Sequence, residues 1–267
     1  MIRDITIGQY YPADSPLHRL DSRVKIVLTL LYIISLFVIN SFIGYAVVIG
    51  CLAIIIKMSK VPFKFMVKGL KALVLIIVFT AIINVLTVKG DTPLCKIWLF
   101  TVTLEGVFYA VKMCLRIILL IIGSSLLTLT TTPIKLTDGI ESLLKPFQKI
   151  GVPAHDIAMM MTIALRFIPT LLDETDKIIK AQQARGADFD TGNLLSKAKA
   201  LVPILVPLFI SAFRRADELA MAMEARCYNG GDNRTRMNVM EVSRADYMAV
   251  AVFVVYFAAL IAIRILI

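Results

Sequence analysis

The chain has 267 residues, of which 58% are hydrophobic, and its mean hydropathy is +0.82. These values lie outside the balance of a soluble domain and indicate a membrane protein. The length suffices for about five spans of roughly 20 residues and one substantial segment outside the bilayer, which excludes several additional soluble domains. We therefore expect an all-α membrane protein with about five transmembrane helices and long cytoplasmic helices.

Hydropathy places the spans in chain order. The apolar segment 24–57 is interrupted only at Asn40-Ser41, and 34 residues in one helix would exceed the bilayer, so we interpret it as two short helices joined there. Segments 70–88 and 104–129 are the next two spans, and 247–265 closes the chain.

Lysine and arginine set the expected orientation, because cytoplasmic loops near span ends are enriched in them. The stretch KMSKVPFKFMVKGLK carries five lysines and no acid, whereas the connection 88–105 has two lysines against two acids. The first should lie inside and the second outside. We expect a multi-pass protein of the cell membrane with a cytoplasmic N-terminus and an external C-terminus.

Three parts of the chain follow from this topology. Residues 1–131 form an N-terminal cytoplasmic segment and four transmembrane helices, 132–245 form a cytoplasmic helical domain, and 246–267 form the last transmembrane helix. The cytoplasmic domain has 15 basic against 13 acidic residues. It therefore lacks the concentrated basic face that nucleic-acid binding requires, and no nucleic acid is expected as a partner.

The five lysines of the basic stretch recur at steps of three, four, four and three, which places them on one side of a helix. We predict a helix that lies on anionic lipid headgroups. The alternative is an ordinary positive-inside loop. The residues are Lys57, Lys60, Lys64, Lys68 and Lys71.

Motifs for catalysis or metal binding are missing. The chain has no GxxxxGK[ST], HExxH or GxSxG, and its two histidines, His18 and His155, stand far apart. The four cysteines show no metal-ligand spacing and are expected to be small packing residues; they are Cys51, Cys95, Cys114 and Cys227. We expect no catalytic residue, no metal site and no cofactor in this chain.

Two charges fall deep within a predicted span. Lys112 and Arg116 lie one helical turn apart. Intramembrane charges often mark a transport pathway, but such a pair can also snorkel or meet carbonyl groups of a neighbouring helix. We favour the structural interpretation.

The segment after the fourth span divides into three helices. Thr132 is the expected N-cap and Pro133 the first position of a short amphipathic helix. Gly151 and Pro153 separate it from a second, longer helix. A third helix runs over about 197–226 and is bent by its two internal prolines.

The two long helices end alike, in AQQARG and AMEARC, with Arg185 and Arg226 41 positions apart. Steps of seven back from each arginine reach apolar residues, so both extend an apolar stripe. A cation at a helix C-terminus and a glycine C-cap explain one such ending. Two of them favour contacts with two similar acidic grooves, because alanine permits close approach and arginine presents a forked donor to a carboxylate.

Five stretches occur in an order that resembles a known family. They are SPLHRLDSRVK, TTTPIKL, GVPAHDIAMMMTIALRFIPTLL, AQQARGAD and SAFRRADELAMAMEARCY. Together they resemble the transmembrane coupling component of energy-coupling factor (ECF) transporters, the EcfT/CbiQ-like family. The resemblance implies a non-catalytic subunit of an ATP-driven importer of a vitamin or metal ion. Its implied partners are two ABC-type ATPases, which bind ATP and Mg²⁺, and one or more small membrane substrate-binding subunits.

The resemblance also assigns roles to the two helix endings. Ala184-Arg185-Gly186 and Ala225-Arg226-Cys227 match the two coupling motifs of the family, each of which docks in a groove of one ATPase. Cys227 departs from the pattern, because the family most often has glycine there. The alternative function is a stand-alone channel or secondary carrier, which would need more polar residues in the spans than Lys112 and Arg116.

Overall fold

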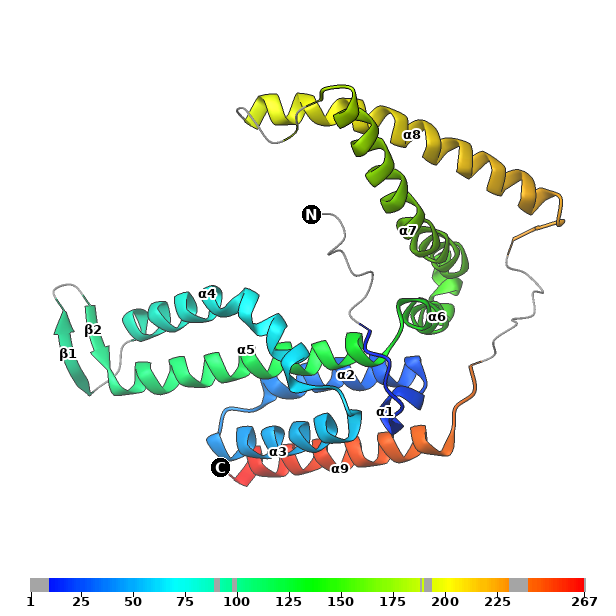
Figure 1. The fold of residues 1–267 in the computed structure, drawn as a ribbon. Helices are drawn as coiled ribbons and strands as arrows, with labels where there is room; N and C mark the ends of the chain where they lie inside the picture. The colour runs from blue at the N-terminus through cyan, green and yellow to red at the C-terminus, as the bar shows by residue number, and fades with distance from the viewer. Residues whose placement is uncertain are drawn as a thin grey trace. The chain divides into compact units, whose positions relative to one another are not determined.

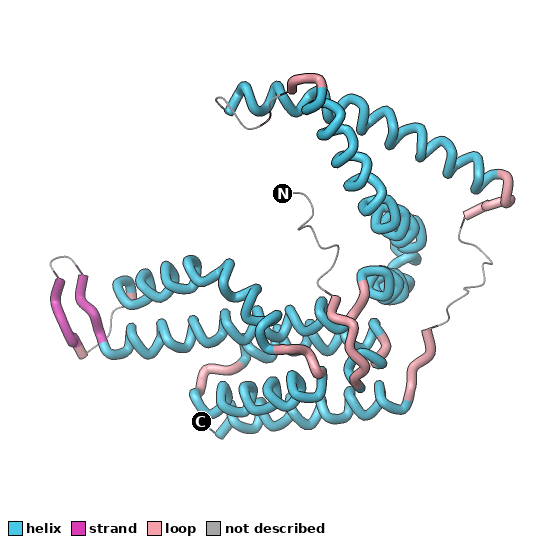
Figure 2. The backbone as a smooth tube through the Cα atoms, in the orientation of Figure 1, coloured by secondary structure: helices cyan, strands magenta, loops and turns pink. Residues whose placement is uncertain are grey.

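The computed structural model describes residues 10–88, 92–97, 100–187, 189, 194–230 and 240–266. The fold is an all-α membrane protein with one small β-hairpin (Figures 1 and 2). The elements are α1 (Pro16–Arg19), α2 (Ser22–Val38), α3 (Phe42–Ser59), α4 (Phe63–Thr87), β1 (Pro93–Ile97), β2 (Phe100–Thr103), α5 (Leu104–Thr130), α6 (Pro133–Leu144), η2 (Lys145–Ile150), α7 (Ala154–Ala184), α8 (Leu194–Glu224) and α9 (Arg244–Leu266).

The chain forms two compact units. The membrane unit comprises Gly8–Ile140 and Val239–Ile267, and the α7–α8 unit contains Glu141–Asn238. In the membrane unit α4 packs along α5, α2 packs on α5, and α9 lies against α2 and α3. Apolar side chains at these contacts form one core, which includes Leu36, Tyr45, Val48, Met66 and Leu129.

The predicted break in the first apolar segment is confirmed. α2 ends at Val38, and the hydroxyl of Ser41 accepts a hydrogen bond from the Gly44 amide as the N-cap of α3. The spans predicted at 70–88, 104–129 and 247–265 correspond to α4, α5 and α9.

Four described helices are long and apolar enough to cross a membrane: α3, α5, α7 and α9. α4 is a fifth if its two parts, which meet at an angle of 60°, count as one span. α2, with 17 residues, reaches the lower limit of a spanning helix. By length and composition alone α7 could also span the membrane, whereas the lysine distribution predicts that it lies in the cytoplasm. The cytoplasmic location of α7 therefore stays a prediction.

The β-hairpin was not predicted. Strands β1 and β2 pair antiparallel, with Ile97 opposite Phe100, in the connection between α4 and α5 (Figure 2). Thr103 ends the hairpin and begins α5, because its hydroxyl accepts from the Gly106 amide at 3.2 Å and donates to the Val88 carbonyl at 3.0 Å. Strands this short give too little periodicity to be recognised in the sequence.

The predicted single helix of five lysines is wrong. α3 ends at Ser59, Lys60 takes a left-handed conformation with φ +56°, and α4 begins only after Pro62. Proline lacks an amide donor and disfavours helical backbone in the residue before it, which favours a helix boundary at this point. Val61 is buried, and its backbone amide donates a hydrogen bond to the Ser59 hydroxyl at 3.2 Å, which holds the turn. Lys57, Lys60, Lys64 and Lys71 are exposed around this turn, and contact with lipid headgroups stays a prediction.

Both deep charges have contacts with neighbouring helices, and Arg116 meets a helix-end carbonyl as the structural interpretation expects. The guanidinium of Arg116 donates to the Ile39 carbonyl at the end of α2 and to the Tyr45 hydroxyl of α3, both at 3.1 Å. The Lys112 ammonium lies 4.9 Å from the centre of the Phe42 ring. Arg116 thus supplies a donor to a helix-end carbonyl that has none within its own helix.

The Arg116→Met substitution tests this contact. It leaves the Ile39 carbonyl and the Tyr45 hydroxyl without a charged donor, and we expect a loss of about 2 kcal/mol of stability, seen as a lower Tm in detergent. Lys112→Met is the matched control and should cost less than about 1 kcal/mol, since it removes only a cation–π contact. Equal Tm values for the two variants would contradict this role of Arg116.

Candidate functional site

The candidate site lies in the α7–α8 unit, at the C-terminal ends of its two long helices. Glu174 of α7 accepts hydrogen bonds from Ser211 at 2.5 Å and from Arg215 at 3.1 Å. Gln182 contacts Pro203, and His155 contacts Tyr228. Residues later in α7 therefore meet residues earlier in α8, so the two helices run antiparallel and their C-terminal ends lie at opposite ends of the pair (Figure 1).

Pro207 explains the contact between Gln182 and Pro203. Pro207 has no amide hydrogen, so the carbonyl of Pro203, four residues earlier, has no donor within α8. The side-chain amide of Gln182 donates to this carbonyl at 3.4 Å. The last turn of α7 is thereby held at the proline-containing part of α8.

α7 ends in a Schellman motif. The amide of Ala187 donates to the Gln182 carbonyl at 3.0 Å, and that of Gly186 to the Gln183 carbonyl at 2.9 Å. Gly186 has φ +89°, as this motif requires at its C′ position. Ala184 and Arg185 are the last helical residue and the C-cap.

α8 ends in the same way. The amide of Tyr228 donates to the Met223 carbonyl at 3.0 Å, and that of Cys227 to the Glu224 carbonyl at 2.8 Å. Cys227 takes the C′ position with φ +54°, although it is not glycine. Ala225-Arg226-Cys227 therefore occupies the three cap positions that Ala184-Arg185-Gly186 occupies at the end of α7.

The two triplets occupy the same positions of the same cap motif. All six residues are exposed. In the described part of the chain neither Arg185 nor Arg226 has an ion-pair or hydrogen-bond partner from its side chain, while the backbone around each is fully engaged in the cap. Each end thus offers a free guanidinium beside an alanine on a fixed turn. This geometry suits a carboxylate-lined groove on another molecule.

The two ends are well separated. From Pro203, which contacts the last turn of α7, to Arg226 the helix α8 rises roughly 35 Å, at about 1.5 Å per residue. One compact groove cannot hold both arginines. Two separate grooves are needed.

The end of α8 has a brace that the sequence did not reveal. The two ring nitrogens of His155, in the first turn of α7, lie 3.1 Å from the Tyr228 hydroxyl and 3.2 Å from the Glu141 carboxylate. Tyr228 directly follows the second triplet. The brace therefore fixes the second end to α6 and to the start of α7, whereas the first end is held by Gln182.

His18 also uses both ring nitrogens in local contacts, with the Ser15 hydroxyl at 2.7 Å and the Tyr11 carbonyl at 3.0 Å. Cys51, Cys114 and Cys227 are free thiols, and Cys95 lies in β1, where its side chain is outside the described set. Among the described residues, no three His, Cys, Asp or Glu side chains gather in a way that would hold a metal ion.

Comparison with known proteins now adds to this geometry. Residues 13–237 match the model of the family CbiQ, described as cobalt transport protein. The chain belongs to this family. It is 61% identical over 250 residues to a Clostridium kluyveri protein named energy-coupling factor transporter transmembrane protein EcfT, with 93% of each chain covered.

Relatives of the same name occur in other bacteria. The Ruminiclostridium cellulolyticum protein is 57% identical with 96% of each chain covered, and the Bacillus subtilis protein is 43% identical with 99% of this chain and 100% of its own covered. The CbiQ match extends over both caps, Ala184–Gly186 and Ala225–Cys227.

Cys227 provides a test of the second cap. A side chain at φ +54° costs about 1 kcal/mol relative to glycine. Cys227→Gly should therefore stabilise the turn and slow hydrogen exchange of the backbone amides of residues 227 and 228 about fivefold. Gly186→Ala is the matched change at the first cap and should speed exchange at amides 186 and 187. Unchanged exchange in both variants would show that the left-handed residues do not set cap stability.

Proposed function

We propose that this chain is the transmembrane energy-coupling subunit of an ECF-type ABC importer. It links ATP hydrolysis by two cytoplasmic ATPases to uptake of a vitamin or metal ion held by a separate membrane subunit. The observation that carries the proposal is the pair of exposed Ala-Arg caps at the C-terminal ends of α7 and α8, which share one hydrogen-bond pattern and lie at opposite ends of the helix pair. The family match and the names of the relatives support it.

Each cap docks in an acidic groove of one ATPase. Arg185 and Arg226 each supply a forked donor that pairs with a carboxylate, and the neighbouring alanine allows the groove wall to come close. The separation of roughly 35 Å along α8 suits two subunits side by side. ATP and Mg²⁺ belong to the ATPases, and this chain contributes no catalytic group.

Contacts between α7 and α8 transmit the motion of the ATPases. When the ATPases close on ATP, they draw the two caps toward each other. The Glu174 contacts with Ser211 and Arg215 and the Gln182 contact with Pro203 keep the helices from sliding freely. The two helices therefore move as rigid bodies, and the angle between them changes without local bending.

The exposed apolar face of α8 receives the substrate-binding membrane subunit. Seven large apolar side chains lie on it, each between 45% and 69% exposed: Leu201, Val202, Leu205, Val206, Phe209, Ile210 and Phe213. An apolar patch of this size on a helix with a polar opposite side is typical of an interface or of contact with lipid. The substrate itself is bound on that partner, so its identity does not follow from this chain.

The orientation completes the proposal. The end of α3 and the first part of α4 face anionic headgroups of the inner leaflet with their exposed lysines Lys57, Lys60, Lys64 and Lys71. The α7–α8 unit lies on the same side, in the cytoplasm, where the ATPases are. The C-terminus is outside.

Charge reversal tests the two docking contacts. Arg185→Glu and Arg226→Glu should each weaken retention of the ATPases on the membrane by at least about tenfold, because a charged hydrogen bond is replaced by repulsion between like charges. The double variant should lose them altogether and should abolish ATP-driven uptake.

Arg214→Glu is the matched control. Arg214 is exposed on the body of α8, away from both caps, and its reversal should leave ATPase retention unchanged. The readout is the ratio of ATPase to this chain in purified membranes. Normal retention in the Arg185→Glu, Arg226→Glu double variant would refute the docking.

Labelling of Cys227 tests the sidedness. In a variant with serine at positions 51, 95 and 114, a membrane-impermeant maleimide should label Cys227 in inside-out vesicles and not in right-side-out cells, because its thiol is exposed on the cytoplasmic unit. Added ATPases should protect it.

A Thr92→Cys variant, made with Cys227 also replaced by serine, provides the opposite control. Position 92 is exposed next to the β-hairpin. It should react from outside only. Labelling of both sites from one side would overturn the topology.

A further inference from the structure

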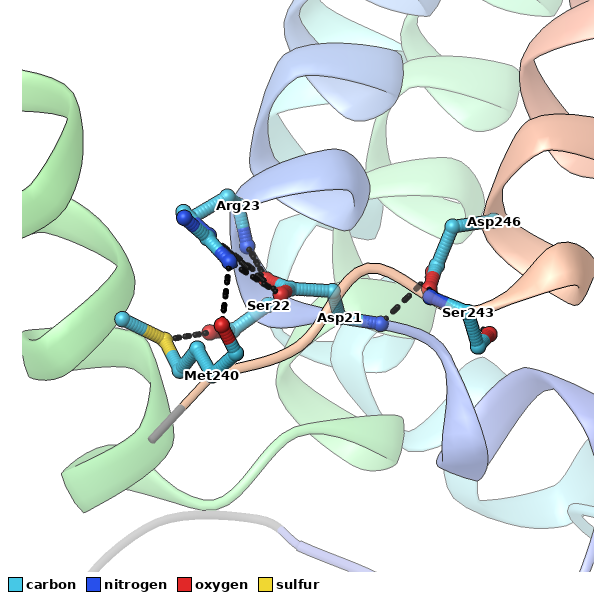
Figure 3. Close-up of polar contacts among 6 residues, drawn as sticks. All are labelled: Asp21, Ser22, Arg23, Met240, Ser243 and Asp246. Carbon is cyan, nitrogen blue, oxygen red and sulfur yellow. Dashed lines mark hydrogen bonds and ion pairs between the residues drawn. The ribbon is translucent and has the colours of Figure 1, made fainter. Parts of the chain in front are cut away.

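The start of α2 meets several distant parts of the membrane unit, and Figure 3 shows the contacts on one side. Four residues form what we call the α2 anchor: Asp21, Ser22, Arg23 and Lys25. Asp21, Ser22 and Lys25 are buried, and Arg23 is half-buried. The membrane unit alone supplies every partner described below.

The first partner is the start of α9. The backbone amide of Asp21 donates to the carboxylate of Asp246 at 2.8 Å. Asp246 is 1% exposed and also accepts from the Ser243 amide at 2.7 Å and the Ser243 hydroxyl at 2.8 Å. One buried carboxylate thus caps α9 and fixes it to the beginning of α2.

The second partner is the chain that leads into α9. The guanidinium of Arg23 bonds the Asp21 carboxylate at 2.8 Å and the Met240 carbonyl at 2.9 Å, and the Ser22 hydroxyl lies 3.6 Å from the Met240 sulfur (Figure 3). Burial raises the pKa of Asp21, but hydrogen bonds from Arg23 outweigh it, so the pKa is lowered and the carboxylate stays charged.

The third partner is the chain that leaves α5. The ammonium of Lys25 donates to the Thr130 carbonyl at 3.0 Å and to the Thr131 hydroxyl at 3.3 Å. α6 then passes close by, since a Cβ atom at Gly139 would lie 2.9 Å from the Ser22 hydroxyl oxygen. Glycine at 139 is what permits this approach.

These contacts coincide with the two places where the chain connects the membrane unit to residues Glu141–Asn238. The chain leaves through Thr130–Ile140 and returns through Met240–Asp246. Both connections are fastened to the same five-residue stretch, 21–25, although about 100 residues separate them in sequence. While the anchor is closed, Thr130–Thr131 and the stretch Met240–Asp246 stay bonded to the start of α2.

We infer that Asp21, Arg23 and Asp246 are positioning residues, which hold both connections so that movement of α7 and α8 reaches the spans instead of being lost as slack at the connections. This inference rests on the proposed function. Without the anchor, the ATPases still dock and hydrolyse ATP, because the caps are untouched. The change that ATP produces in the α7–α8 unit then reaches the spans only in part.

Spin-label distances in the assembled complex test this inference. One nitroxide is attached at Glu218→Cys on α8 and one at Met248→Cys on α9, both exposed, in a chain with the four native cysteines replaced. The distance distribution is recorded without nucleotide and with ATP plus vanadate, which traps the ADP formed by hydrolysis. The ATPase rate and the amount of ATPase bound are measured on the same samples.

Asp246→Asn and Arg23→Gln open the anchor, and Asp14→Asn and Arg19→Gln are their matched controls in an exposed ion pair. The intact chain and the controls should show a discrete shift on trapping with vanadate. The anchor variants should show a broad distribution and a lost shift, with ATPase binding and rate within about twofold of the intact chain, and amides 21 and 243 should exchange about tenfold faster.

The outcomes separate the inference from the proposal beneath it. A shift in the intact chain that persists unchanged in Arg23→Gln overturns the anchor and leaves the proposed function standing. No bound ATPase on the intact chain overturns the proposed function itself. If Asp246→Asn does not accumulate in the membrane, the milder Arg23→Gln decides alone, since the Arg23 side chain is 28% exposed. If ATPase binding and the spin-label distance shift fall together, the residues have a merely structural role, and this result also overturns the anchor.

Discussion

A helix leaves its last carbonyl groups without donors from its own backbone, and the bilayer offers no water to replace them. Two central contacts of the membrane unit answer that constraint. Arg116 donates to the carbonyl at the end of α2, and Lys25 donates to the carbonyl at the end of α5. These two donors connect elements distant in sequence, so satisfying helix ends also assembles the membrane unit.

The same constraint shapes the two caps. Because each Schellman turn satisfies the final carbonyls with backbone amides, the arginine side chains at the C-cap positions are not needed for that purpose. They project as free cations on rigid turns. The arginine side chains are not needed to stabilise this chain, so they can bind a partner without breaking an internal contact. The proposed coupling role depends on this separation of backbone and side-chain tasks.

Much of the architecture was predictable because its signals are local. Long apolar runs gave the spans, Pro133 marked the start of α6, and the two Ala-Arg endings marked the caps. The prediction of a lysine helix failed because a period of three and four was followed through Pro62, although proline favours a helix boundary; Pro62 is the N-cap of α4. The His155–Tyr228 brace and the Asp21–Asp246 contact join residues 73 and 225 positions apart, and no periodicity in a single sequence encodes such pairs.

The central claim is that this chain works as one subunit of an ATPase-driven assembly. The most direct measurement is native mass spectrometry of the tagged, full-length chain extracted from its own membrane in mild detergent. The account predicts a complex that contains one copy of this chain, two ABC-type ATPase subunits and a small membrane protein. Recovery of the chain alone, stable and monodisperse, would contradict it.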